Sequence, residues 1–555
     1  MFELEVEKLL KNVGIKEVEF ETPPQKEFGD IAFPCFQLAK KEKKNPVEIA
    51  KNIASKIKTK DTIFTKVEAR GPYVNIFFDW EKISEKILKQ MLKFKMDLGK
   101  GKKVMVEYSQ PNPVHPMHIG HARTTFLGDA VANVLDFVGY KVVKANYMND
   151  TGLQVAKLVA AYLEWAKGKK PEGKPDFWLW QYYVKYHEEE NNNPSLEEKA
   201  REILRKVELE ENKAAKKVWD QIVDWCIEGF EQTYKRVGVN FDVYLHESKF
   251  RKAGKKLVEA AIKKGIASKN DEGAIVAGLE KYDLKKTIIL RSDGTGLYVT
   301  SDLGMTLYKF EKYKLDKAIW VVSSEQNLYF QQLFKIFELL GYKFFKNCYH
   351  LSFDLVRLSE GKMSSREGRA VMLDEVVSKI VDLAYQEVSK RNSELTEKEK
   401  IELAEKIGIG ALKYAIVRIE PENQIIFDWN QMLSFDGNTG PYLQYAHTRC
   451  SSILKKAGKW KPNYSVEVNE HEKELLKTIM KFPEAVEHAA KEMKPYLICN
   501  YAYELATTFA NFYEKCPVLK AEQDTKNFRL TLVQATKIGL EKSLNLIGIQ
   551  VPEKM

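Results

Sequence analysis

Two histidines and the glycine between them are the first residues in this chain whose types and spacing could do chemistry. His118 and His121 lie three residues apart around Gly120, at the start of a stretch whose apolar residues have helical spacing. Residues three apart on a helix share one face, and the unpaired N–H groups and dipole at a helix start favour an anion. Because Gly120 has no side chain, a flat base or a ribose can approach the backbone. The spacing therefore predicts a site for a phosphate-bearing ligand.

Two other interpretations of the histidine pair are open. The histidines could be ordinary core or surface residues, or they could bind a metal ion. No third ligand follows at metal-binding spacing, and the HExxH pattern of metalloproteases is absent. The β-prone run and proline-rich loop that precede the pair favour the phosphate interpretation.

The polar loop at 359–369 is the second group of residues whose types could do chemistry. Two cations and two hydroxyls lie between Gly361 and Gly368, which leave the loop free to move: Lys362, Ser364, Ser365 and Arg366. Such a loop can close on a polyphosphate and neutralise charge that develops on a leaving group. An isolated basic loop is usually no more than solvated surface. The histidine pair upstream favours the functional interpretation.

Residues 104–139 contain the elements that must position the histidines. An apolar, β-prone run precedes the proline-rich loop, a helix pattern follows and ends at Gly139, and a second β-prone run begins there. This order predicts the first half of a nucleotide-binding fold. Ligands of open parallel sheets bind beyond the carboxyl ends of the strands. We therefore expect the chemistry at Asn112, His115, His118, Gly120 and His121.

The whole chain divides into four predicted regions. Residues 1–100 form a mixed α/β region, with helix patterns at 2–13 and 47–58 and strand patterns at 63–69 and 73–78. Residues 101–370 form an α/β domain that contains a helical insertion at about 151–235. Beyond Met372 nearly everything is helical apart from a loop around FDGNTGP, with a connecting region at 371–436 and a terminal domain at 437–555.

Bulk composition narrows the class of protein. The 555 residues suffice for several domains, and the net charge of +10 gives nucleic-acid binding only weak support. Six scattered cysteines without a CxxC pair indicate reduced thiols in a cytoplasmic protein rather than a metal site. No apolar run is long enough to cross a bilayer, and the amphipathic N-terminus has no cleavage site.

The histidine pair and the polar loop together resemble the HIGH and KMSKS-like motifs of class I aminoacyl-tRNA synthetases. The surrounding residues narrow this resemblance to the arginyl-tRNA synthetase family: VEYSQPNPVHPMHIGHARTTFLGD (106–129), LYVTSDLG (297–304), KMSSREGR (362–369) and GNTGPYLQYAHTR (437–449). GDIAFPCFQLAK (29–40) and NLIGIQVPEKM (545–555) extend it over essentially the full chain. His115 stands where the family varies, and Arg366 replaces the second lysine of the usual loop. A planar guanidinium is not equivalent to an ammonium, so the part of Arg366 in phosphate binding is open.

The resemblance implies a fold and a reaction. The fold would be a Rossmann-type parallel-sheet catalytic domain with a small α/β N-terminal domain and an all-α, anticodon-binding C-terminal domain. The reaction would join L-arginine to ATP, supplied with Mg²⁺, as arginyl-adenylate, and then transfer arginine to the 3′-terminal adenosine of tRNA-Arg. No tightly bound metal, no membrane contact and a monomeric, cytoplasmic enzyme are expected.

The resemblance also implies roles for single residues. His118, His121 and Lys362 would be catalytic, and ATP would further contact His115, Gly120, Ser364, Ser365 and Arg366. Glu107 and Asp302 would bind the guanidinium, because a fork of N–H donors matches carboxylate oxygens in pairs. Ser109 and Asn112 would hold the amino and carboxylate end, Tyr298 would line the pocket and Gln326 would add a polar contact. Alternatively, Asp302 is a helix N-cap and Glu107 a surface charge at a strand end.

Contacts with tRNA follow from the same resemblance. The anticodon would meet Tyr442, Tyr445, Arg449, Tyr513 and Met555, and the tRNA elbow would meet Tyr73 and Asn75 of the N-terminal domain. Aromatic residues at helical spacing are more often core than base platforms, so a packing role is the alternative for each.

Three rival functions are open at this point. A small nucleotidyltransferase would not explain the helical C-terminal half, and a cysteinyl enzyme would need metal-binding thiols. A tRNA-binding protein derived from a synthetase, with a silent active site, is the rival from another class. The presence of Glu107, His118, His121, Asp302 and Lys362 argues against it.

Overall fold

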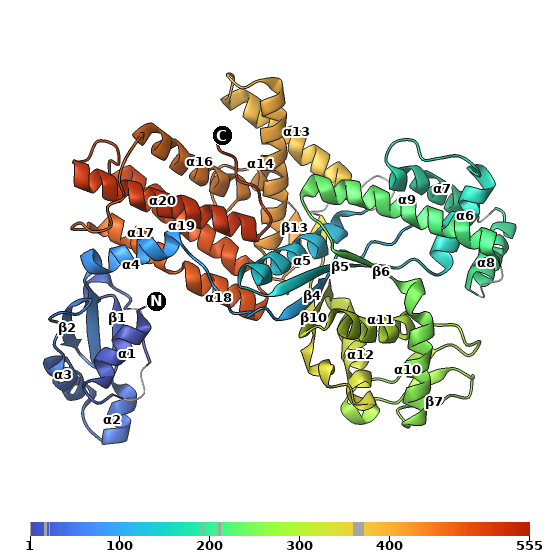
Figure 1. Cartoon of the computed structure of the whole chain (residues 1–555), viewed down its shortest axis with the longest axis horizontal. Coiled ribbons are helices and arrows are strands. Elements are labelled where there is room, and N and C mark those ends of the chain that lie inside the picture. Colours follow the sequence, from blue (N-terminus) through green and yellow to red (C-terminus); the bar gives the residue numbers. More distant parts are fainter. Residues whose placement is uncertain are drawn as a thin grey trace.

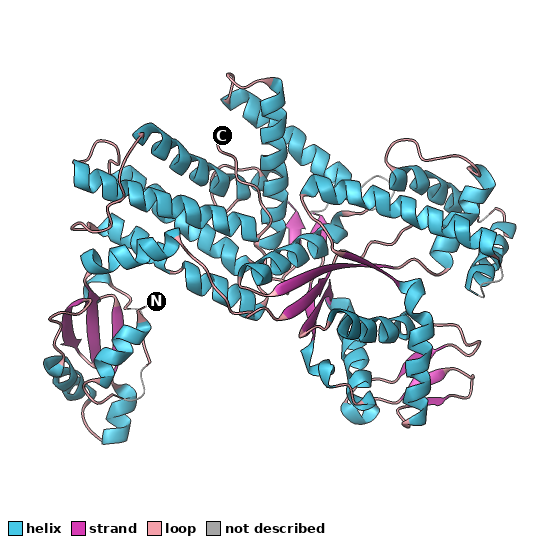
Figure 2. Cartoon of the chain, viewed as in Figure 1, coloured by secondary structure: helices cyan, strands magenta, loops and turns pink. Residues whose placement is uncertain are grey.

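A computed structural model describes residues 2–15, 19–21, 23–190, 192–208, 212–358, 371–427 and 429–555 of the chain. A small N-terminal α/β module, a central parallel sheet with helices around it, and a C-terminal helical bundle follow one another along the chain (Figure 1). Helix dominates outside the two α/β regions (Figure 2). Within the described residues, none of the helices is both long and apolar enough to span a membrane.

The N-terminal module is an antiparallel sheet in the order β1-β3-β2 with helices around it. Its elements confirm the two helix and two strand patterns expected here: α1 (Glu3–Lys11), β1 (Ile31–Pro34), α2 (Phe36–Glu42), α3 (Pro46–Lys56), β2 (Phe64–Arg70), β3 (Tyr73–Phe78) and α4 (Trp80–Leu92). The buried Asp30 carboxylate accepts hydrogen bonds from the Phe78 N–H and Trp80 Nε1, and lies 3.0 Å from Lys477 Nζ of the C-terminal bundle. This ion pair ties the module to the bundle.

Five parallel strands form the central sheet in the order β11-β10-β4-β5-β6. They are β4 (Lys103–Glu107), β5 (Lys141–Met148), β6 (Val243–His246), β10 (Lys317–Ser323) and β11 (Cys348–Phe353). Helix α5 (Ile119–Phe137) is buried along most of its length, because it is covered by the sheet on one side and by the C-terminal helices on the other. The parallel order confirms the nucleotide-binding fold predicted from residues 104–139.

Helices separate β5 from β6, in the segment where a helical insertion is predicted: α6 (Leu153–Trp165), α7 (Pro175–Glu189), α8 (Ser195–Glu208) and α9 (Lys213–Val237). A second, three-stranded sheet follows, with β7 (Ala267–Lys269), β8 (Ile275–Ala277) and β9 (Thr287–Leu290) next to α10 (Arg251–Lys263) and α11 (Tyr298–Tyr313). Helix α12 (Asn327–Leu340) returns the chain from β10 to β11. Short 3₁₀ turns lie at 26–28, 247–250, 280–282, 324–326 and 343–347.

The C-terminal half is a bundle, with α13 (Leu373–Arg391), α14 (Glu397–Val417), α15 (Trp429–Met432), α16 (Gly440–Ala457), α17 (Glu470–Met480), α18 (Phe482–Glu492), α19 (Tyr496–Lys515) and α20 (Gln523–Leu546). One strand was not expected there. β13 (Ile425–Phe427) pairs in parallel with β12 (Val356–Leu358). The expectation of helix between Met372 and the loop at FDGNTGP was wrong at this point, because pairing with a distant strand decides the conformation of three residues.

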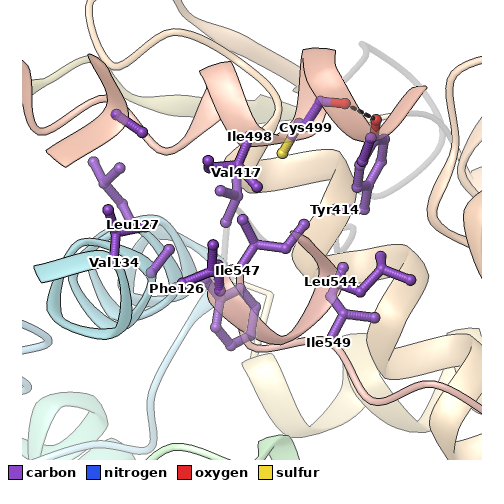
Figure 3. Packing of buried hydrophobic residues seen from close by; sticks show 14 of the residues in the cluster. Phe126, Leu127, Val134, Tyr414, Val417, Ile498, Cys499, Leu544, Ile547 and Ile549 are labelled. Atoms are coloured by element: carbon purple, nitrogen blue, oxygen red, sulfur yellow. Dashed lines mark hydrogen bonds between the residues drawn. The ribbon is translucent and has the colours of Figure 1, made fainter. Parts of the chain in front are cut away.

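The bundle packs directly on helix α5. Phe126, Leu127 and Val134 of α5 belong to the same buried cluster as Val417 of α14 and Ile547 after α20 (Figure 3). A continuous apolar core therefore joins the histidine-bearing helix to the C-terminal domain. The six cysteines are free thiols, as expected, and five of them are buried.

Candidate active site

The carboxyl edge of the central sheet gathers the predicted site residues. Glu107 is the last residue of β4, and the 3₁₀ turn that contains Gln326 follows β10. The Pro-rich loop after β4 leads to the histidines, and Glu247 directly follows β6. Since neighbouring parallel strands end at the same edge, this placement agrees with ligand binding beyond the strand ends.

The three histidines form a compact cluster at the start of α5. The ring centroids of His118 and His121 are 3.9 Å apart, and His115 lies 5.8 Å from the first and 6.0 Å from the second. Burial, reinforced by His115, lowers the pKa of His118 to about 4. Burial and the two neighbouring rings also hold the pKa of His121 well below its usual range. Both rings are therefore neutral at physiological pH.

Hydrogen bonds fix the tautomer of the two rings. His118 Nδ1 accepts from the Gly120 N–H at 3.1 Å, and His121 Nδ1 accepts from the His118 N–H at 3.1 Å. A neutral imidazole that accepts at Nδ1 carries its proton on Nε2. Each ring thus presents an Nε2–H donor, which suits a phosphate oxygen.

The structure corrects the expectation that free backbone N–H groups of the helix start receive an anion. The N–H groups of His118 and Gly120 donate to the two rings, and the Ile119 N–H donates to the Val371 carbonyl at 3.0 Å. Gly120 also has a more specific reason to be glycine. A Cβ atom there would lie 2.8 Å from His118 Cε1, so the absent side chain makes room for the folded-back imidazole.

Glu107 forms an ion pair with a lysine of the same chain. Its carboxylate is 4% exposed and lies 2.5 Å from Nζ of Lys309, which is 2% exposed on α11. This burial rules out the alternative that Glu107 is a surface charge. Lys309 therefore balances the charge of Glu107.

Asp302 and Glu247 are two further carboxylates in this part of the protein. Asp302 lies inside α11, whose N-cap is Leu297, so the N-cap alternative is wrong. It accepts a hydrogen bond from the Tyr329 hydroxyl, and burial raises the pKa of Asp302 to about 7. Glu247 is fully buried, accepts from the Tyr147 hydroxyl at 2.8 Å, and burial likewise raises the pKa of its carboxyl group.

Glu247 was missed by reasoning from sequence. Its carboxylate adds to the electrostatic environment that raises the pKa of Asp302, and it lines a cleft of about 710 Å³ together with Gly152, Arg251 and Tyr298. The signal that could have found it is its place directly after the β-prone run VYLH, where a strand of the parallel sheet ends.

Other predicted arginine-binding residues take different positions. Tyr298 is 57% exposed and accepts a hydrogen bond from Asn149 Nδ2 at 3.1 Å, while Asn112 and Gln326 are exposed. Ser109 is buried, and its Oγ lies 2.6 Å from the Tyr234 hydroxyl and accepts from Thr125 Oγ1 at 2.8 Å. Its hydroxyl therefore has partners within the protein.

The predicted loop residues Lys362, Ser364, Ser365 and Arg366 lie outside the described residues. The chain on its downstream side is attached to the histidine loop, because the Leu373 N–H donates to the Met117 carbonyl at 2.7 Å. On its upstream side the chain leaves from β12.

Comparison with known proteins identifies the family. A model of the class I tRNA synthetase (R) catalytic domain matches residues 83–429, a DALR anticodon-binding domain matches 443–555, and an arginyl-tRNA synthetase N-terminal domain matches 2–78. The chain belongs to the arginyl-tRNA synthetase family. Arginine–tRNA ligase of Treponema denticola is 37% identical over 97% of this chain and 95% of that protein, and that of Clostridium perfringens is 38% identical over 96% and 95%. The arginyl-tRNA synthetase of Thermus thermophilus has a TM-score of 0.84 at 27% identity, covering 100% of this chain and 99% of its own.

The family's anticodon-binding domain contains a cluster of the residues predicted to contact RNA. Arg449 Nη1 donates to the Tyr445 hydroxyl at 2.8 Å, and its guanidinium lies 4.4 Å from the Tyr513 ring centroid. Tyr442 instead lies beside Tyr503, and Met555 packs against the core. The structure thus brings three of the five residues together.

The two N-terminal residues predicted to contact the tRNA elbow differ in their exposure. Tyr73 is partly exposed and its ring stacks edge-on with the exposed ring of Phe36, with centroids 5.5 Å apart. Asn75 is only 3% exposed, which favours its packing alternative. The described residues hold no group of three or more His, Cys, Asp or Glu that could bind a metal.

Proposed function

We propose that this chain is an arginine–tRNA ligase. It joins L-arginine to ATP as arginyl-adenylate with release of pyrophosphate, and then transfers arginine to the 3′-terminal adenosine of tRNA-Arg. The observation that carries the proposal is the proximity of two sites at one sheet edge: buried carboxylates held by tyrosines, and neutral histidines with Nε2–H donors. The full-length similarity to arginine–tRNA ligases supports it.

In the first step a carboxylate oxygen of arginine bonds to the α-phosphorus of ATP, and the bond to the bridging oxygen breaks. Pyrophosphate takes the electron pair, and no enzyme group forms a covalent bond. The enzyme must align the reactants and stabilise negative charge. His118 and His121 donate from Nε2 to phosphate oxygens, and His115 borders the same space. Lys362, with Ser364, Ser365 and Arg366, would neutralise the leaving pyrophosphate, whose Mg²⁺ arrives with ATP.

Arginine is selected by its guanidinium. Asp302 and Glu247 offer carboxylate oxygens to the N–H fork, and Tyr298 covers it from the cleft side. Glu107, whose charge Lys309 balances, supports the pocket and is available to the α-amino group with Ser109 and Asn112, while Gln326 adds a polar contact. A smaller amino acid would leave buried carboxylates unpaired, which gives a discrimination on the order of 10⁴ or more without an editing domain.

The second step requires that the same protein also binds tRNA. Tyr445, Arg449 and Tyr513 form a stacking and hydrogen-bonding cluster for anticodon bases, with Tyr442 and Met555 nearby in the same domain. Tyr73 is available to the tRNA elbow, with Asn75 behind it in the strand.

ATP–pyrophosphate exchange with tRNA-Arg present tests the proposal. We expect exchange with arginine and none with citrulline, which has nearly the same shape but no positive charge. Charging of tRNA-Arg should follow the same preference. Exchange with another amino acid and none with arginine would contradict the specificity. Binding of tRNA-Arg without any exchange would identify a silent RNA-binding relative instead.

A further inference from the structure

Arg123 is a buried cation that the reaction described above does not use. It lies on α5, five residues after His118, and is 0% exposed. Burial lowers the pKa of Arg123 to about 10, so the guanidinium is still charged at neutral pH. Among the residues that the structure describes, it forms no ion pair with a carboxylate. The charges of Asp354 and Glu422 favour the charged form, and a buried charge without a direct ion pair also depends on hydrogen bonds.

Backbone carbonyls supply acceptors for the two terminal nitrogens of Arg123, while its Nε has no hydrogen-bond partner among the described residues. Nη1 donates to the carbonyls of Ile416 at 2.5 Å and Ile419 at 3.4 Å, and Nη2 donates to those of Glu420 at 3.0 Å, Pro421 at 3.3 Å and Asn423 at 3.4 Å. These carbonyls belong to the last turn of α14 and the turn after it. Carbonyls at a helix end lack partners within the helix and carry the negative end of its dipole, which favours a cation.

The turn whose carbonyls accept from Arg123 also forms hydrogen bonds with the residues just before β12. The Pro421 carbonyl accepts from the Asp354 N–H at 2.8 Å, and the Ile425 N–H donates to the Leu355 carbonyl at 3.2 Å. Strand β13 then pairs with β12. One guanidinium therefore connects α5 to the end of α14 and to both short strands.

We propose that Arg123 is a positioning residue for the ATP site. It sets the place of the α5 start, with the Nε2–H donors of His118 and His121, relative to the α14 turn and the β12–β13 pair. Displacement of the reacting groups by about 1 Å can cost on the order of a hundredfold in rate. Because α14 packs against α16, this link also connects the ATP site to the helix that carries Tyr445 and Arg449. The inference rests on the proposed function.

Arginine is suited to this place because its planar fork reaches carbonyls on both sides at once. Lysine would keep the charge, but its ammonium has three donors on one atom and cannot span the same set. Arg123→Lys therefore removes the geometry and preserves the charge.

The experiment compares Arg123→Lys with Leu127→Ala, which opens a cavity on the same helix without touching the carbonyls. Steady-state exchange gives KM for ATP and for arginine, and thermal melting gives Tm. We expect both variants to lower Tm. Only Arg123→Lys should raise the KM for ATP, by about tenfold or more, with KM for arginine within about twofold of wild type.

Equal ATP KM values in the two variants at a similar loss of Tm would overturn the proposal and leave Arg123 a structural residue. If Arg123→Lys does not fold, Pro421→Gly loosens the carbonyl turn and leaves the arginine intact, and the same selective rise in ATP KM is expected. An unchanged ATP KM in Pro421→Gly would again contradict the link. Absence of exchange in the wild type would instead refute the proposed function.

Discussion

The two ends of the proposed active site, the histidine cluster and the buried carboxylates, differ in how their charge is controlled. At the ATP end, neutral imidazoles accept from their own helix backbone and turn their Nε2–H donors outward. At the arginine end, buried carboxylates accept from tyrosines, and the pKa of Asp302 rises to about 7. The first end presents fixed dipoles without a net charge. The second contains carboxylates whose pKa values are raised by burial.

The difference also shows in how charge is balanced. Lys309 neutralises Glu107 within the pocket, so part of the acidic charge is permanently compensated. Around Arg123, backbone carbonyls accept from both terminal nitrogens, and the charges of Asp354 and Glu422 also favour the charged guanidinium. Charge is therefore compensated by a direct ion pair at Glu107 and largely by backbone carbonyls at Arg123.

The largest expected effect comes from breaking the arginine end. Asp302→Asn removes a carboxylate that a guanidinium would pair with and keeps the shape. We expect the KM for arginine to rise about a hundredfold or more, since truncating one member of a buried charge pair costs roughly 2–5 kcal/mol. Exchange kinetics measure it, and KM for ATP serves as the internal control. An unchanged arginine KM would show that the guanidinium partner lies elsewhere.

The ATP end should respond through rate rather than through arginine binding. His118→Asn retains a side-chain oxygen that can cap the Gly120 N–H but loses the distal Nε2–H. We expect kcat for exchange to fall by about a hundredfold, as when one oxyanion donor is removed, at nearly unchanged Tm. His118→Gln, which retains a distal amide donor, should recover part of the rate. Equal losses in the two variants would contradict the donor role.

A smaller effect follows from the pKa of Asp302. Binding of a guanidinium favours the ionised carboxylate, so a proton must leave Asp302 below a pH of about 7. The apparent KM for arginine should therefore fall as pH rises, by about tenfold from pH 6 to pH 8, and level off above that. Asp302→Asn should abolish this dependence. A pH profile that is the same in wild type and variant would assign the titration to another group.

Local patterns predicted much of the fold. The helix at 119–137 and the strands at 64–70 and 73–78 could be predicted because apolar periodicity reports which face is buried. Strand β13 could not, since its three residues form a strand only through pairing with β12 about seventy residues earlier in the chain.

The site residues likewise divide into those that the sequence could predict and those that it could not. The spacing of His118 and His121 predicted a phosphate site, and the resemblance to the family added Asp302; all three lie within recognisable stretches. Glu247 and Lys309 stand in ordinary-looking sequence, and only the tertiary structure places Glu247 at the end of β6 and Lys309 of α11 against Glu107 of β4. The anion-ready helix start expected from sequence was wrong in detail, because the rings of His118 and His121 occupy the N–H groups themselves.

By itself, the sequence determined the family, and it predicted the sheet edge of the site and the residue types for phosphate binding, because these depend on local order along the chain. Tertiary structure alone decided which tautomer each histidine carries, which carboxylates remain unneutralised and that Arg123 links the catalytic helix to the α14 turn. Those properties depend on distances between residues up to about three hundred positions apart, where burial and hydrogen-bond geometry set charge and orientation.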